Sequence, residues 1–282
     1  MPAGTRVLVI GGGKMGEAIL KGWIASDIEP ADSIVASNIE VAEPGADRRA
    51  FLQQTHGVVC HAAAVEVQER PDVVVLAVKP QVMSEVLKPL ATADAFQGGA
   101  KGPLFVSIAA GLPTQSVAAQ LPAGARLVRV MPNMPLAIGA GASGVCGAES
   151  TAAEDVDYVA ALFSCLGRAV VVDEADMDAV CAVSGSGPAY VVAMIESLRD
   201  AGVRAGLSDE VAQTLALQTV LGTARLLDET GAELAATRES ICSPGGTTLA
   251  ALDAMNAAGF DDVFDAGVRA AVVRSKELAQ CI

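Results

Sequence analysis

The sequence predicts an α/β protein in which an N-terminal doubly wound parallel sheet precedes an all-helical C-terminal dimerisation domain. Short β-branched runs alternate with segments of helical periodicity over residues 1–172. Strand patterns are missing from residues 173–282, where long helical patterns follow one another. A glycine-rich turn joins the first apolar run to the first helical segment, as in Rossmann-like folds. We therefore expect a dinucleotide-binding domain at 1–172 and a helical domain for substrate binding and oligomerisation at 173–282.

Composition and charge exclude several classes of partner. The 282 residues are 52% apolar but only 3% aromatic, so the core is built mainly from Ala, Val, Leu and Ile. A formal net charge of -14 repels the phosphates of nucleic acids and anionic membrane surfaces. The longest uncharged stretch, 130–148, is broken by Pro132 and Pro135, and the run at 7–10 lacks a cleavage site. We expect neither a membrane span nor a secretory signal, and a cytoplasmic location.

Cysteines and histidines give little support for a metal site. The six cysteines are far apart and form no CxxC pair, which predicts inert or buried thiols without a disulfide framework. His56 and His61 are the two histidines of the chain, and both fall near one expected loop. The sequence therefore predicts no metal site and no catalysis by a histidine base.

The first domain is expected to form from strands linked by crossover helices. The expected strands are 7–10, 33–36, 58–60, 73–78, 104–108 and 127–130. The expected helices between them are 15–25, 47–55, 81–90 and 114–120. The glycine-rich piece 133–147, a helix at 152–166 and a strand at 168–172 extend the edge of the sheet.

The second domain is expected to consist of four helices that are too apolar to stand alone. Their ranges are 176–205, 209–229, 247–257 and 262–279. Ala and Val occupy more than one face of these helices, and a helix that is apolar all round must be buried on every side. A domain of this size cannot bury them by itself, so we expect a homo-oligomer that associates through this domain.

The segment Gly11-Gly12-Gly13-Lys14-Met15-Gly16, called the glycine loop below, fits the pattern GxGxxG directly after the first strand. Gly11 permits a tight turn, Gly13 lets a pyrophosphate approach the backbone, and Gly16 lets helix and strand pack closely. Lys14 and Met15 open the helix, whose free amides bind phosphate. This predicts dinucleotide binding; the alternative is a turn with a structural role only.

The end of the expected second strand bears on the choice of coenzyme. It reads Ala36-Ser37-Asn38, without the carboxylate that usually binds the ribose 2'-hydroxyl of NAD. Ser37 and Asn38 can donate hydrogen bonds to a 2'-phosphate, and Lys14, Arg48 or Arg49 can supply positive charge. This predicts NADPH as the coenzyme, with NADH as the alternative. The lysine and the arginine pair can equally be solvated surface residues.

Loops that follow parallel strands form the ligand crevice of a doubly wound sheet. The expected coenzyme neighbours in these loops are Ala77, Val78, Lys79, Pro80, Ala109 and Asn133. Near the C-terminus, Ser243-Pro244-Gly245-Gly246-Thr247-Thr248 precedes an apolar helical run, which predicts a helix start with free amides. Such a start can bind a carboxylate, or it can be an ordinary helix cap.

Five motifs that follow the glycine loop in order carry a family resemblance. They are LAVKP at 76–80, SIAAG at 107–111, RVMPNMP at 129–135, VSGSGPAY at 183–190 and SPGGTT at 243–248. The chain resembles the pyrroline-5-carboxylate reductases along essentially its whole length. The resemblance implies reduction of 1-pyrroline-5-carboxylate to L-proline by NAD(P)H, and intertwined dimers. It also implies that Ser243, Gly245, Gly246 and Thr247 bind the substrate carboxylate while Thr248, the catalytic candidate, binds the ring nitrogen.

The sequence departs from the family pattern at two places. Ile39 follows Asn38 where many relatives have an arginine, and residues 62–64 are alanines where relatives often have an asparagine. Two other functions are alternatives to this reaction. A β-hydroxyacid dehydrogenase needs a lysine in the helix at 187–198, which has none. A regulatory protein that senses NADPH without turnover is opposed by the motif at 243–248 alone.

Overall fold

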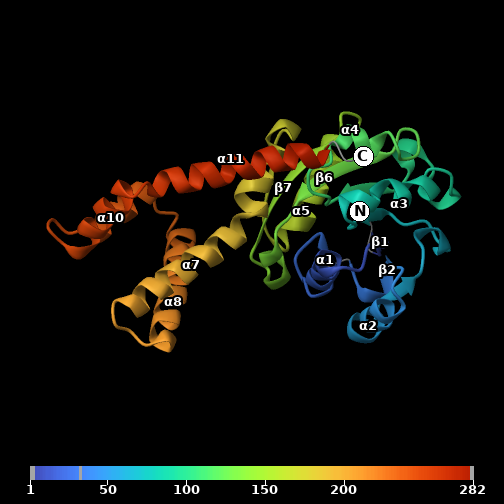
Figure 1. The fold of residues 1–282 in the computed structure, drawn as a ribbon. Coiled ribbons are helices and arrows are strands. Elements are labelled where there is room, and N and C mark those ends of the chain that lie inside the picture. The colour runs from blue at the N-terminus through green and yellow to red at the C-terminus, as the bar shows by residue number, and fades with distance from the viewer. Residues whose placement is uncertain (1–3, 32–33, 280–282) are drawn as a thin grey trace. The chain divides into compact units, whose positions relative to one another are not determined.

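The computed structural model describes residues 4–31 and 34–279, which separate into two compact units. The first unit runs up to Ser186 and includes the chain from Ala271 onward, and the second unit is Gly187–Ala270 (Figure 1). The predicted boundary between residues 172 and 173 follows the last strand and marks the change from strands to helices. The units defined by contacts divide the chain at Ser186 and again at Ala271.

The first unit contains one sheet of eight strands in the order β3-β2-β1-β4-β5-β6-β7-β8. β7 runs antiparallel to β6, and the other neighbouring strands are parallel. The order β3-β2-β1-β4-β5-β6 is that of a Rossmann fold, which confirms the predicted class. The strands are β1 Val7–Ile10, β2 Ile39–Ala42, β3 Val59–His61, β4 Val73–Leu76, β5 Leu104–Ser107, β6 Arg126–Met131, β7 Gly141–Gly147 and β8 Gly167–Val171.

Helices cover both faces of this sheet (Figure 1). They are α1 Lys14–Ile24, α2 Ala46–His56, α3 Met83–Leu90, α4 Thr114–Ala118 and α5 Ala153–Ser164. Because side chains alternate along a strand, β1 serves two cores: Val7 and Val9 join one apolar cluster, and Leu8 and Ile10 join the other. A strand buried on both faces reads as a continuous apolar run, which is why β1 and β4 could be predicted.

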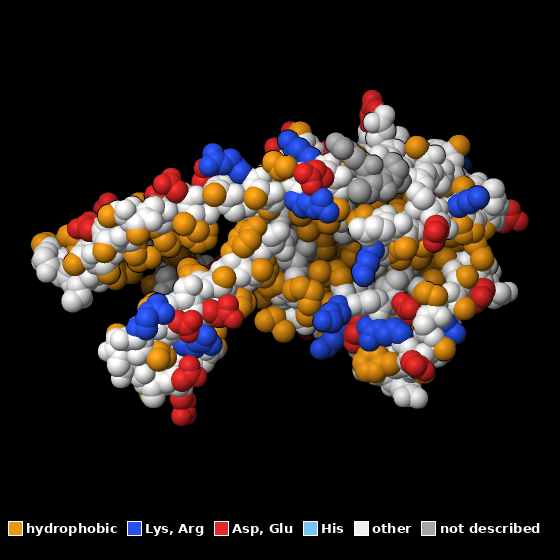
Figure 2. Space-filling model, viewed as in Figure 1, with side chains coloured by type: hydrophobic (Ala, Val, Ile, Leu, Met, Phe, Trp, Pro, Cys, Tyr) orange, Lys and Arg blue, Asp and Glu red, His pale blue; other side chains and the backbone are white. Residues whose placement is uncertain are grey.

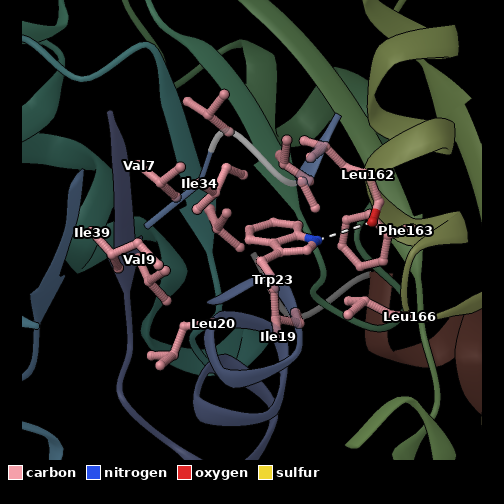
Figure 3. Close-up of a cluster of buried hydrophobic side chains, with 14 of the residues drawn as sticks. Val7, Val9, Ile19, Leu20, Trp23, Ile34, Ile39, Leu162, Phe163 and Leu166 are labelled. Atoms are coloured by element: carbon pink, nitrogen blue, oxygen red, sulfur yellow. Dashed lines mark hydrogen bonds between the residues drawn. The ribbon is translucent and has the colours of Figure 1, made fainter. Parts of the chain in front are cut away.

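Trp23 anchors α1 in the core on one face of the sheet (Figure 3). Its indole packs edge-on against Phe163 of α5, with ring centroids 5.7 Å apart. Its Nε1 donates a hydrogen bond to the backbone oxygen of Leu162 at 2.9 Å, which satisfies a fully buried donor. The C-terminal end of α1 is therefore fixed in the core by Trp23.

The second strand lies later than predicted. The prediction placed it at 33–36, a range whose first residue lies outside the described residues and whose remainder forms no strand. β2 is Ile39–Ala42 instead. Ile34 is buried in the core (Figure 3). Residues 34–36 therefore have the composition of a buried strand, but they do not pair in the sheet. The prediction was wrong because Glu40 interrupts the apolar run of β2, and this glutamate is accommodated by a hydrogen-bonding contact with His61 on β3.

Helices follow the last strand, as predicted, but the first expected one is not uniform. They are α6 Met177–Val180, a π-helical turn Cys181–Gly185, α7 Gly187–Arg204, α8 Asp209–Thr230, α9 Leu234–Ile241, α10 Thr247–Ala257 and α11 Phe260–Leu278. The π-helical turn accepts a hydrogen bond at Ser184 O from the Asn133 side chain at 2.9 Å. A Cβ on Gly185 would lie 2.5 Å from the terminal methyl group of Met131, so the two residues pack closely at this turn. The sequence did not predict α9.

The helices of the second unit bury few of their own side chains. α7 and α10 have no buried residue among those described, and α8 has two, Ala212 and Ala216. Hydrophobic side chains gather along α7 and α10 (Figure 2). A hollow of about 740 Å³ lies within this unit, lined by Tyr190, Ala193, Met194, Ser197, Leu198, Ala201, Met255, Phe260, Val263, Phe264 and Gly267. This surface is typical of a face that another chain covers.

One helical stretch of the described chain, Glu174–Arg204, is long and apolar enough to cross a membrane by those two criteria alone. The stretch contains the π-helical turn and begins in the first unit, where Met177 and Ala182 are fully buried. Long apolar helices of oligomeric proteins meet the same criteria because other subunits bury them.

Candidate functional site

The three motif glycines of the glycine loop differ in what surrounds them. Gly11 has a φ of +106°, and a Cβ there would lie 2.5 Å from the backbone oxygen of Ala77. A Cβ on Gly16 would lie 2.2 Å from the oxygen of Gly11. Gly13 has no atom within 4 Å of the Cβ position. Gly11 and Gly16 are thus required by the fold, whereas Gly13 leaves open the space through which a pyrophosphate would approach. The loop therefore fits a dinucleotide.

The start of α1 offers backbone donors beside that open space. The first hydrogen bond of the helix runs from Glu17 N to Gly13 O at 2.9 Å, so the amides of Lys14, Met15 and Gly16 precede it. No side chain caps this helix. Lys14 is exposed, and Met15 packs partly against the core. The uncapped amides and the helix dipole together favour a bound anion.

The other predicted coenzyme neighbours follow β4, β5 and β6 at the same edge of the sheet. Ala77–Pro80 follows β4, and Ala77 N donates to Ile10 O at 2.8 Å, next to the glycine loop. Ala109 follows β5 and is buried. Asn133 follows β6 and is also buried, and its Oδ1 accepts a hydrogen bond from Ala142 N at 2.9 Å. With its Nδ2 bonded to the π-helical turn, the Asn133 side chain has a supporting role.

Ser37 and Asn38 do not follow the second strand. They form the 3-10 turn Ala36–Asn38 that precedes β2, and their side chains hydrogen-bond each other at 3.4 Å. Because β2 runs parallel to β1, this turn lies at the edge of the sheet opposite to the glycine loop. The prediction that these two residues bind a 2'-phosphate was wrong because it depended on the misplaced strand.

Glu43 is the residue that follows β2, and sequence reasoning missed it. Its Oε2 accepts a hydrogen bond from Gly12 N at 3.0 Å, and its Oε1 accepts one from Gly45 N at 2.9 Å. A carboxylate therefore stands against the glycine loop. The signal that could have located it is the run Ile39–Ala42 followed by Glu-Pro-Gly and the start of a helix.

Arg48 ties α2 to the glycine loop. Its Nε donates to Gly12 O at 2.5 Å, and its guanidinium pairs with Glu17 of α1. His56 also contacts Glu17, at 2.9 Å. Burial alone would raise the pKa of Glu17, but the hydrogen bonds from His56 and Arg48 outweigh it and lower that pKa. Arg48 is thus engaged within the protein and stabilises the loop.

The predicted substrate segment, Ser243–Thr248, forms the start of α10 as expected. Gly245 has a φ of +69°, and Gly246 N donates to Ser243 O at 2.9 Å, which closes a turn. The helix opens with a hydrogen bond from Ala250 N to Gly246 O at 3.3 Å. The amides of residues 247–249 precede that bond, and no side chain caps the helix. Thr248 is half-buried at the second helical position. The segment belongs to the second unit.

In the described part of the chain, no group of three or more His, Cys, Asp or Glu side chains is placed to hold a metal ion. The five described cysteines are free.

Two family models match the chain. Residues 6–111 match a model described as NADP oxidoreductase, coenzyme F420-dependent, and residues 174–278 match one described as pyrroline-5-carboxylate reductase dimerisation. Together with the sheet order and the glycine loop, these matches define an NAD(P)H-dependent oxidoreductase with a C-terminal segment for subunit association.

Relatives of known function give the particular family. The pyrroline-5-carboxylate reductase of Synechocystis sp. is 43% identical over 96% of this chain and 97% of its own length. A solved pyrroline-5-carboxylate reductase from Coxiella burnetii has a TM-score of 0.88 at 33% identity and covers 98% of both chains. The Plasmodium falciparum enzyme, solved with NADP bound, has a TM-score of 0.83 at 29% identity, covering 99% of this chain and 100% of its own. The chain belongs to the pyrroline-5-carboxylate reductase family.

The protein therefore catalyses the reduction of 1-pyrroline-5-carboxylate to L-proline with NAD(P)H, the final step of proline biosynthesis. This confirms the family and reaction predicted from the five motifs. Neither alternative, a β-hydroxyacid dehydrogenase or a sensor without turnover, is supported by these relatives. The whole Glu174–Arg204 stretch lies within residues 174–278, which match the dimerisation family.

Proposed function

We propose that the substrate carboxylate binds at the start of α10 and that Thr248 acts on the ring nitrogen during reduction. The observation that carries this proposal is the uncapped helix start at Ser243–Thr248, where backbone amides of Thr247, Thr248 and Leu249 precede the first hydrogen bond of α10. Backbone amides and the helix dipole stabilise a carboxylate without a buried cation. The hydroxyls of Ser243 and Thr247 add further donors.

The turn before α10 determines how closely the substrate can approach. Gly245 needs its left-handed conformation, and a Cβ on Gly246 would lie 3.0 Å from the oxygen of Ser243. The lack of side chains at both glycines keeps the amides accessible. Thr248 stands one residue into the helix, so its hydroxyl lies close to the carboxylate position and can hydrogen-bond the ring nitrogen.

The coenzyme is assigned to the glycine loop and the loops after β4, β5 and β6. Its phosphates bind the amides at the start of α1, and Ala77, Val78, Lys79, Pro80, Ala109 and the backbone at Asn133 form the walls. When bound, NAD(P)H supplies a hydride to the imine carbon. The protonated imine already carries the charge that attracts hydride, so the enzyme's residues mainly orient the ring and exclude water.

The proposal includes intertwined dimers formed by the second unit, in a cytoplasmic enzyme. Support comes from the exposed apolar residues of α7 and α8, among them Val192, Leu198, Leu215 and Leu221, each exposed by 47% or more. The match of residues 174–278 to a dimerisation family supports the same face. In the proposed dimer the helices of the two subunits wrap around each other.

The substrate site is tested by comparing pyrroline-5-carboxylate with 1-pyrroline, which has the same imine and no carboxylate. Ser243→Ala is expected to raise the KM for pyrroline-5-carboxylate about tenfold, as loss of a hydrogen bond to a charged group does, and to leave kinetics with 1-pyrroline unchanged. Ser240→Ala, in the exposed end of α9, is the matched control. Equal effects on both substrates would contradict a carboxylate site at Ser243.

The reaction is tested directly by following oxidation of NADH and NADPH when pyrroline-5-carboxylate is added, with proline measured by chromatography. Formation of one proline for each coenzyme oxidised is expected. A purified protein that binds coenzyme and forms no proline would contradict the assigned reaction.

A further inference from the structure

The carboxylate of Glu43 is placed where a dinucleotide fold selects between its two coenzymes. In Rossmann folds an acidic residue at the carboxyl end of the second strand binds the ribose 2'-hydroxyl of NAD, whereas a cation there accommodates the 2'-phosphate of NADP. β2 ends at Ala42, and Ala42 O accepts a hydrogen bond from Gly11 N at 2.9 Å. The backbone of Ala42 therefore contacts the glycine loop directly, and Glu43 is the next residue in the chain.

The backbone holds this carboxylate in a defined position. Oε2 accepts a hydrogen bond from Gly12 N and Oε1 accepts one from Gly45 N, at 3.0 and 2.9 Å. Each carboxylate oxygen has two lone pairs, so both oxygens keep the capacity to accept a further hydrogen bond from a ribose hydroxyl. A Cβ on Gly12 would lie 3.3 Å from Cβ and Cγ of Glu43, so the glycine loop packs closely against the Glu43 side chain.

The two nearby arginines bind groups other than the Glu43 carboxylate. Arg48 donates to Gly12 O and pairs with Glu17. Arg49 donates to the backbone oxygens of Glu43 and Pro44 at 2.8 and 2.7 Å. Lys14 is exposed at the start of α1. In the part of the chain that the structure describes, neither arginine forms an ion pair with the Glu43 carboxylate. The Glu43 carboxylate is thus bound by two backbone amides, one of them in the glycine loop, and by neither arginine.

We propose that Glu43 is a specificity-determining residue that binds the adenosine ribose 2'-hydroxyl and shifts coenzyme selection toward NADH. This inference rests on the proposed position of the coenzyme at the glycine loop. A 2'-phosphate monoester carries a charge of about -1.5 to -2 at neutral pH. Placed beside an ionised carboxylate it is repelled, whereas a hydroxyl donates a charge-assisted hydrogen bond to the same oxygens.

The test compares wild type with Glu43→Gln, Glu43→Ser and the matched control Glu40→Gln. Glu40 lies on β2, three residues before Glu43, and is also a glutamate, but its partner is His61 on the neighbouring strand. Two quantities are measured for each protein: kcat/KM with NADH and NADPH at saturating pyrroline-5-carboxylate, and the Kd of each coenzyme by isothermal titration calorimetry. Thermal melts monitored by circular dichroism show whether each variant is folded.

Both Glu43 variants are expected to shift the NADPH-to-NADH ratio of kcat/KM, and of affinity, at least tenfold toward NADPH. Glu40→Gln is expected to leave both ratios within about twofold of wild type. An unchanged ratio in folded Glu43 variants, or an equal shift in Glu40→Gln, overturns the assignment of Glu43 alone. Wild-type protein that binds neither coenzyme overturns the proposed coenzyme position and this inference with it.

Discussion

Thr248 is the residue on which the proposed chemistry depends most. It lies at the second position of α10 and is half-buried, and in the proposal its hydroxyl hydrogen-bonds the ring nitrogen as hydride arrives. Thr248→Ala removes one such bond, and turnover is expected to fall by about one to three powers of ten. Thr248→Ser keeps the hydroxyl and is expected to retain most of the activity. Steady-state kinetics with pyrroline-5-carboxylate checks both.

Thr237→Ala is the control for Thr248, because Thr237 is a helical threonine whose hydroxyl bonds only its own helix, to Glu233 O at 2.9 Å. It is expected to leave kcat unchanged. Wild-type kinetics in Thr248→Ala would remove Thr248 from the mechanism.

Cys146 shows what burial does to a thiol in this protein. It lies on β7 and is 3% exposed. Burial, with the nearby Glu174 carboxylate, raises the pKa of the Cys146 thiol to about 11. At pH 8 only about one thiol in a thousand is then ionised, so Cys146 is expected to resist iodoacetamide in the folded protein and to react in urea. Mass spectrometry of the peptide containing Cys146 measures this, and rapid labelling without denaturant would contradict it.

At the scale of elements, the turn between β1 and α1 contains glycines with different roles. Gly16 is needed for packing, whereas Gly13 is expected to lie next to the coenzyme. Gly13→Ala places a methyl group in open space at a φ of -67°, so the melting temperature is expected to change by only a few degrees. Coenzyme affinity is expected to fall at least tenfold, because the methyl group occupies the path of the pyrophosphate. Gly16→Ala forces a Cβ against the Gly11 oxygen, and a destabilisation of about 1–3 kcal/mol is expected.

Thermal melts and calorimetric titration with NADH separate these two effects. If Gly13→Ala binds coenzyme as wild type does, the phosphates do not approach at Gly13. If Gly16→Ala has an unchanged melting temperature, α1 can move away from β1 at little cost.

The same elements show which features a sequence can predict. The glycine loop and the α10 start could be predicted because local rules determine them: a glycine pattern follows a strand, and a polar turn precedes an apolar helix. A local signal for β2 and Glu43 also exists, in the run Ile39–Ala42 and the Glu-Pro-Gly after it, but that signal alone does not select between two candidate strands. Two apolar runs compete there, one centred on Ile34 and one at Ile39–Ala42, and pairing with β1 selects the second. Nothing local to the sequence shows that Glu40 is stabilised by His61 across the sheet.

The π-helical turn at Cys181–Gly185 has a similar cause. The sequence predicts a helix over residues 176–205, and it does not predict a π-helical turn within it. The turn is stabilised by a distant residue, Asn133, whose side chain bonds both Ser184 O and the start of β7. The place of Asn133 in the sequence, after a strand, predicted that it lies at the ligand edge. The structure shows that its amide nitrogen and its amide oxygen each have a partner within the protein.

At the scale of the whole molecule, a net charge of -14 has to be reconciled with two anionic ligands. The proposed sites use the starts of two helices, α1 for the coenzyme phosphates and α10 for the substrate carboxylate. Backbone amides act over the first turn of a helix, so they bind anions locally without a cationic surface. This is consistent with the engagement of Arg48 and Arg49 in the protein's own contacts.

Association through the second unit follows from how little of its apolar surface the unit buries. The hollow of about 740 Å³ is lined by Leu198 of α7 and Val263 of α11, which are 47% and 67% exposed. Leu198→Glu places a charge where a partner chain would bury it, and such burial is costly. Light scattering is expected to show wild type as a dimer or larger, and Leu198→Glu as a smaller, less stable species. Ile28→Glu, at a 59% exposed position of the first unit, is the control and is expected to assemble normally. A wild-type monomer, or normal assembly of Leu198→Glu, would show that this face does not form the interface.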